Sequence, residues 1–126
     1  MKKQIIVTFM VIAGMLFEGC TEKKKHNEKH YQTILCNELD GVMEQSLLDR
    51  TRIDCLTDEY AIEVDFSKKW AESVGQSLYY AEMTGKKPAV ALIVRDNKKD
   101  KRHLKRLKVL AEKFDIKVYE IEKGEY

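Results

Sequence analysis

The chain has 126 residues, a length that indicates one domain. Its formal net charge of +2 is too small to indicate nucleic-acid binding by itself. Hydrophobic residues make up 44% of the chain and charged residues 35%, which is ordinary for a soluble globular protein. The three cysteines include no Cys-x-x-Cys spacing, which argues against a zinc ribbon or a thioredoxin site.

The first 20 residues have the pattern of a bacterial export signal. Lys2 and Lys3 precede an apolar run over residues 5–17, which is shorter than the roughly 20 residues that span a bilayer. Residues 17–20 resemble a lipoprotein box, with Cys20 as the lipidated first residue of the mature chain. Plain secretion and an uncleaved N-terminal anchor are the alternatives. We therefore expect an exported protein at the cell envelope, periplasmic or on the cell surface, with a lipid anchor in the membrane.

The next segments predict a tether, a helix and three strands. Residues 21–29 are polar and lack apolar periodicity, which predicts a tether before a domain of residues 30–122, and residues 123–126 form a polar tail. Apolar spacing over residues 30–39 predicts an amphipathic helix that ends at Asp40-Gly41. Residues 42–48, 52–56 and 60–65 predict an antiparallel meander. Cys36 and Cys55 form either a disulfide or two buried apolar side chains.

The second half of the chain predicts two helices alternating with two strands. Ser67 is the expected cap of a helix that runs to about residue 83 and stops at Thr84-Gly85. Residues 88–94 form a continuous apolar run, typical of a strand buried on both faces. A last helix lies within residues 96–114 and a final strand over 116–121. The order predicts an α/β (α+β) domain with a mixed β-sheet of about five strands flanked by helices.

Acidic residues on the predicted third strand indicate a metal site. Glu63 and Asp65 are two residues apart, so both carboxylates leave the same strand face. Paired carboxylates resist desolvation unless a cation or a proton lies between them. Asp54, on the preceding strand, adds a third acid. This pattern is typical of a metal-dependent phosphodiesterase site.

The element order and these acids together resemble the PD-(D/E)xK nuclease superfamily, the fold of restriction enzymes and Holliday-junction resolvases. Its αβββαβ core, here with a further helix and strand, would cover residues 30–121. The family motif has an acid on the second strand, an acid-x-lysine on the third and, in many resolvase-like members, a glutamine on the next helix. Asp54, Glu63 and Gln76 match these positions. Residues 51–80 are also similar to a group of small bacterial proteins of unassigned function.

The resemblance implies that Asp54 and Glu63 are ligands of Mg²⁺ or Mn²⁺. Asp65 stands where the motif lysine belongs, and it would be either a third metal ligand or an ion-pair partner of Lys69. In some superfamily members the lysine has moved to the following helix, so Lys69 is the expected replacement.

Lys68 is the alternative to Lys69 as the displaced lysine. The lysine would assist the attacking water or the scissile phosphate, and Gln76 would position it.

Cationic and aromatic residues outside the acids predict where nucleic acid binds. Arg52 shares a strand face with Asp54 and either holds a phosphate or balances the acids. Glu44 either extends the acidic cluster or lies in solvent. The expected nucleic-acid contacts are Arg52, Lys68, Tyr80, Lys101, Arg102, Lys105 and Arg106. A core position is the alternative for Tyr80, and a solvated face or anionic lipid headgroups are the alternatives for the basic helix.

The predicted function is metal-dependent hydrolysis of phosphodiester bonds in nucleic acid, with DNA as the expected substrate. Two other functions remain open. One is a nucleic-acid-binding module of the same fold that has lost cleavage, and the other is a structural envelope lipoprotein whose acids and lysines form only salt bridges. The catalytic interpretation requires Asp54, Glu63 and Lys69 to converge in space.

Overall fold

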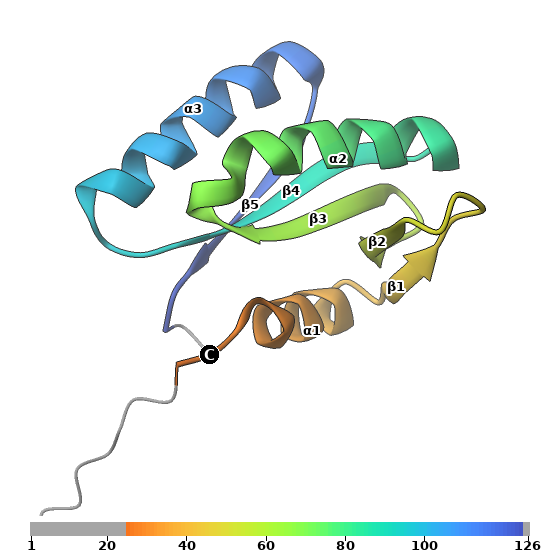
Figure 1. Cartoon of the computed structure of the whole chain (residues 1–126), viewed down its shortest axis with the longest axis horizontal. Helices are drawn as coiled ribbons and strands as arrows, with labels where there is room; N and C mark the ends of the chain where they lie inside the picture. The colour runs from red at the N-terminus through yellow and green to blue at the C-terminus, as the bar shows by residue number, and fades with distance from the viewer. Residues whose placement is uncertain (1–24, 125–126) are drawn as a thin grey trace, which may run out of the picture.

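A computed structural model describes residues 25–124 of the chain (Figure 1). The predicted export signal, the predicted lipidation site at Cys20 and the first part of the predicted tether, residues 21–24, lie outside the described residues. Between residues 25 and 124, no helix is long and apolar enough to cross a membrane.

A five-stranded mixed sheet with strand order β1-β2-β3-β4-β5 forms the centre of the domain, which confirms the predicted fold class. β1 (Val42–Ser46), β2 (Arg52–Leu56) and β3 (Tyr60–Phe66) form an antiparallel meander. β4 (Lys87–Val94) and β5 (Lys117–Glu122) continue the sheet in parallel with β3. Both parallel connections contain a helix, because a short turn cannot join parallel strands.

Helices cover both faces of the sheet. α1 (Glu28–Glu38) lies on one face, and α2 (Trp70–Thr84) and α3 (Lys98–Phe114) lie on the other (Figure 1). Because side chains alternate along β3, Ile62 and Val64 pack with Tyr31 of α1. The acids of β3 therefore face α2. Val74 of α2 packs on strand β4.

The boundaries of two helices differ from the prediction. α1 begins inside the predicted tether, because the side chain of Asn27 accepts a hydrogen bond from the backbone N–H of His30. Ser67 is not the cap of α2. It opens a 3₁₀ turn, η1 (Ser67–Lys69), and α2 follows with Lys69 at its N-cap position and no side-chain cap. The hydroxyl of Ser67 instead lies 3.4 Å from Nδ1 of His103.

A disulfide between Cys36 and Cys55 joins α1 to β2, with 5.7 Å between the Cα atoms. The sequence left this pairing open. Gly41 lies against it, since a Cβ on Gly41 would be 2.4 Å from Sγ of Cys55 and 2.8 Å from Sγ of Cys36. Asp40, not Gly41, adopts the left-handed conformation after the helix, with φ 52°. Glycine is required at position 41 by the close approach of the sulfur atoms.

Candidate active site

Asp54 lies where β2 and β3 separate. The two strands pair at Cys55 with Ile62 and at Leu56 with Ala61. Beyond this point the N–H of Val64 donates to Oδ2 of Asp54 at 2.8 Å. The carboxylate of Asp54 is thereby turned toward β3 and fixed beside Glu63.

Glu63 is the most unusual of the acids, because it is only 4% exposed and its Oε1 has no hydrogen-bond partner. Burial, followed by the charges of Asp54 and Asp65, raises the pKa of Glu63 to about 9. Burial also raises the pKa of Asp54, although the Val64 N–H opposes that rise. At neutral pH Glu63 therefore carries a proton, which it shares with Asp54 through the hydrogen bond between the two carboxyl groups.

Asp65 is held by α2 and by the turn before it. Its Oδ2 accepts a hydrogen bond of 2.6 Å from the hydroxyl of Ser73, a fully buried residue of α2. Its Oδ1 lies 3.4 Å from Nζ of Lys69. Of the two roles predicted for Asp65, the structure forms the ion pair with Lys69. The negative charge of Asp65 is the largest cause of the raised pKa of Lys69.

Glu28, in the first turn of α1, is a site residue that the sequence did not reveal. Its Oε2 lies 3.9 Å from Nζ of Lys69. Burial and the nearby charge of Asp65 raise the pKa of Glu28 to about 7. The available sequence feature was an acid just before an amphipathic helix, where negative charge is common because it favours the helix N-terminus. Nothing in the sequence showed that this turn meets the end of β3.

Gln32, also on α1, links Glu44 to the site. Its Nε2 donates to Oε1 of Glu44 at 2.9 Å and to the backbone carbonyl of Asp54 at 2.7 Å. Arg52 lies 3.5 Å from Oε2 of Glu44, so its charge balances Glu44 at the edge of the sheet. Lys29 adds a third contact at 2.6 Å, and together these contacts lower the pKa of Glu44. Glu44 thus supports Asp54 indirectly, through Gln32.

The predicted helix residues lie in different surroundings. Gln76 is half-buried on α2, and among the described residues no hydrogen bond joins it to Lys69. Tyr80 is 5% exposed and packs with Ile53 and Ala61. Its ring therefore belongs to the core and is not presented to a base, which corrects the expected nucleic-acid contact.

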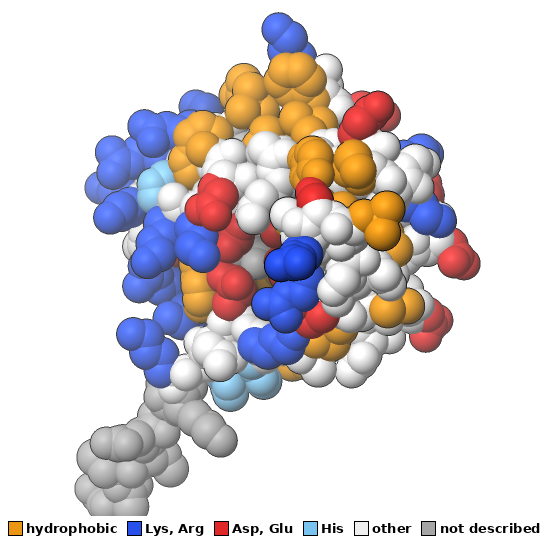
Figure 2. All heavy atoms as spheres, turned by 45° about the vertical axis from the view of Figure 1, so that its right-hand side comes forward, with side chains coloured by type: hydrophobic (Ala, Val, Ile, Leu, Met, Phe, Trp, Pro, Cys, Tyr) orange, Lys and Arg blue, Asp and Glu red, His pale blue; other side chains and the backbone are white. Residues whose placement is uncertain are grey.

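The basic residues of α3 are exposed. Lys101 pairs with Asp96 at 2.5 Å, and Lys108 pairs with Glu120. Lys105 and Arg106 also lie in solvent, as does Arg102. Figure 2 shows lysine and arginine side chains gathered along the left margin of the view, beside acidic side chains nearer its centre.

The acids fit a hard divalent cation. Within residues 25–124, no three His, Cys, Asp or Glu side chains form a group that could hold a metal ion by themselves. Mg²⁺, however, is usually held by one or two carboxylates, together with water and substrate phosphates. Asp54 and Glu63 are such a pair, because the charge of Asp54 raises the pKa of Glu63 and because Oε1 of Glu63 is buried without a partner. A cation would take the place of the shared proton.

No family model matches the chain, and no curated protein or solved structure matches it either. The resemblance to PD-(D/E)xK nucleases therefore depends on the order of the elements and on the residues of the site.

Proposed function

We propose that this protein hydrolyses phosphodiester bonds of nucleic acid, with DNA as its substrate, in a reaction that depends on Mg²⁺ or Mn²⁺. The observation that carries the proposal is the carboxyl group of Glu63, which is buried beside Asp54 with one oxygen unpartnered and a pKa of about 9. A buried acid in that condition is costly unless a ligand uses it. The acids on the second and third strands of an αβββαβ core support the superfamily assignment.

Asp54 and Glu63 would hold the metal ion, which supplies polarisation of a phosphate oxygen and a lowered pKa for bound water. The protein's own groups prepare that site. The Val64 N–H fixes the carboxylate of Asp54, and the hydroxyl of Ser73 fixes Asp65. Asp65 in turn keeps the ammonium group of Lys69 next to the acids, where it can attract the scissile phosphate.

A second function, nucleic-acid binding without cleavage, is favoured by the surroundings of Lys69. Its ammonium group lies between Asp65 at 3.4 Å and Glu28 at 3.9 Å. Two carboxylates already compensate its charge, and the position of the motif lysine is occupied by Asp65 itself. Cleavage requires Lys69 to exchange at least one of these partners for phosphate.

We place this activity at the cell envelope. The support is the predicted export signal, which ends in a lipoprotein-like box at Cys20, together with the disulfide between Cys36 and Cys55, since disulfides persist in oxidising compartments. An anchored enzyme there would meet nucleic acid outside the cytoplasm.

The test is cleavage of labelled single-stranded, duplex and branched DNA in the presence of Mg²⁺, Mn²⁺ or EDTA. We expect cutting by the wild type only with metal, and loss of cutting in Glu63→Gln and Lys69→Ala. Glu82→Gln removes an exposed carboxylate of α2 and serves as the control. Metal-dependent binding without cutting would support the binding module instead. If the wild type neither binds nor cuts DNA, the remaining function is that of a structural lipoprotein.

A further inference from the structure

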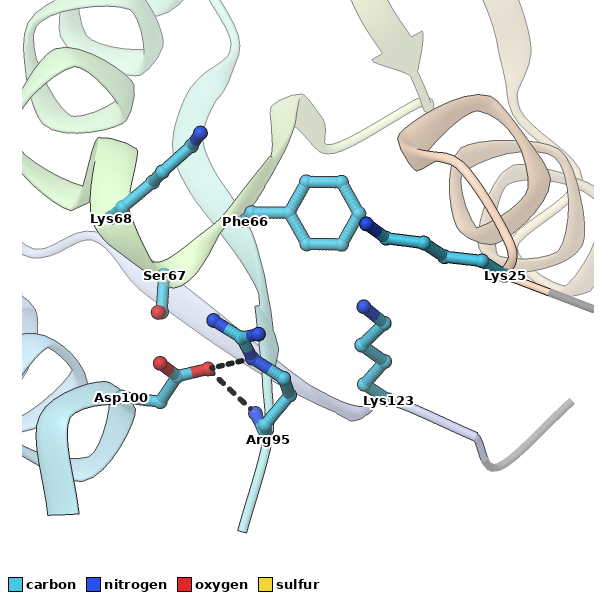
Figure 3. Close-up of a pocket in the computed structure, with 7 residues that line it drawn as sticks. All are labelled: Lys25, Phe66, Ser67, Lys68, Arg95, Asp100 and Lys123. Carbon is cyan, nitrogen blue, oxygen red and sulfur yellow. Dashed lines mark hydrogen bonds and ion pairs between the residues drawn. The ribbon is translucent and has the colours of Figure 1, made fainter. Parts of the chain in front are cut away.

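A cavity of about 220 Å³ opens next to the acidic site, and four cations line it: Lys25, Lys68, Arg95 and Lys123. Phe66 forms its apolar wall, and Asp100 is its acidic residue. Figure 3 shows the ammonium groups of Lys25 and Lys123 directed toward the Phe66 ring, with the guanidinium of Arg95 beside Asp100.

The topology of the sheet brings these residues together. Phe66 ends β3, and Lys68 lies in the turn that follows it. Arg95 comes directly after β4, and Lys123 directly after β5. The carboxyl ends of adjacent parallel strands meet at one edge of an α/β sheet, which is where such sheets bind ligands. Lys25 reaches the same edge from the segment before α1.

The cavity has more positive charge than its own acid can balance. Asp100 is 3% exposed, and its Oδ2 accepts from the backbone N–H of Arg95 at 2.8 Å and from Nε at 3.3 Å. This pair fixes Arg95 in place. Among residues 25–124, no carboxylate forms an ion pair with Lys25 or Lys68. The ammonium group of Lys123 lies 5.5 Å from the centre of the Phe66 ring.

We infer that this cavity binds a phosphate group of the nucleic-acid substrate, next to the phosphodiester bond that is cleaved at the acids. This inference rests on the proposed function. The cavity and the acidic site share one turn, η1, because Lys68 lines the cavity while Lys69 pairs with Asp65. A phosphate held at Lys68 would lie one residue along the chain from Lys69, the partner of Asp65. Positive groups in a concave site suit phosphate oxygens, and Asp100 holds one of them, Arg95, in place.

The inference can be tested by fluorescence anisotropy with a labelled single-stranded DNA oligonucleotide in EDTA, using the full chain at several salt concentrations. The test variant replaces Lys25, Lys68 and Lys123 with alanine and keeps Arg95, because Arg95 is tied to Asp100. The matched control replaces Lys87, Lys113 and Lys117, which removes equal charge near the opposite ends of β4, β5 and α3. Melting curves establish that all three proteins are folded.

We expect the test variant to bind roughly tenfold more weakly than the wild type, as loss of charged phosphate contacts requires. Its slope of log affinity against log salt should fall by about one, and the control should keep the wild-type slope. If DNA affinity falls equally in both variants, or does not fall in the test variant, the cavity is not a phosphate site. The proposed function would be unaffected by that result.

A wild type that neither binds nor cuts DNA would overturn the proposed function, and this inference with it. Vesicles with and without anionic phospholipid complete the experiment. If the test variant loses vesicle binding but keeps DNA binding, the cavity recognises a lipid phosphate and the inference is refuted.

Discussion

The protonation of Glu63 gives the sharpest prediction, because it links the geometry of the site to a measurable pH dependence. Glu63 has a pKa of about 9 in the folded protein against an ordinary value of 4.5. Between these values the folded state binds a proton that the unfolded state has released. The free energy of unfolding therefore falls as pH rises through this window, by about 1.4 kcal/mol per pH unit for a single group.

Glu63→Gln keeps the shape of the side chain and removes the ionisation. Between pH 7 and pH 9 we expect the wild type in EDTA to lose about 2 kcal/mol more than this variant, because the pKa of about 9 lies at the upper end of that range. Glu28, whose pKa is raised to about 7, is present in both proteins, and Glu63 is not among the groups that shift it, so the difference between the two proteins isolates Glu63.

The assay is urea unfolding followed by circular dichroism at half-unit steps of pH. Glu82→Gln, an exposed glutamate on α2, should keep the wild-type profile. Parallel pH profiles for wild type and Glu63→Gln would show that Glu63 ionises normally, and the account of the site would then be refuted.

Three further predictions concern the residues that hold the site together. Reduction of the Cys36–Cys55 disulfide, which closes a separation of 19 residues, should lower the free energy of unfolding by about 3 kcal/mol in denaturant titrations. Gly41→Ala should lower the melting temperature of the oxidised protein, because the added Cβ meets both sulfur atoms, and a melting temperature equal to wild type would contradict this packing. Ser73→Ala should cost about 1–3 kcal/mol at pH 7, since Asp65 loses a buried donor, whereas an unchanged unfolding midpoint would show that water replaces it.

Local periodicity was sufficient to predict the sheet and the acids. The alternation of apolar and acidic residues along residues 60–65 placed Ile62 and Val64 on one face and Glu63 and Asp65 on the other, and the structure has this arrangement. The continuous apolar run over residues 88–94 likewise predicted the doubly covered strand β4. These features depend only on neighbours along the chain.

The remaining parts of the site depend on contacts between distant segments. Glu28 meets Lys69 because α1 crosses the sheet near the end of β3, and no spacing in the sequence encodes that crossing. The Val64 N–H can bond to Asp54 because β2 and β3 stop pairing at this point. The alternating pattern of the strands does not predict where that pairing stops. Tyr80 was predicted to contact nucleic acid because the sequence pattern of a helix does not distinguish a buried aromatic residue from an exposed one.

In the proposed function, Asp54 and Glu63 hold a divalent cation in place of the proton between their carboxyl groups. Isothermal titration of the protein with Mn²⁺ at pH 7.5, in two buffers of different ionisation enthalpy, measures both the binding and the protons released. We expect binding with release of close to one proton, and loss of that release in Glu63→Gln. Binding that releases no proton from the wild type, or no binding at all, would contradict the proposed function.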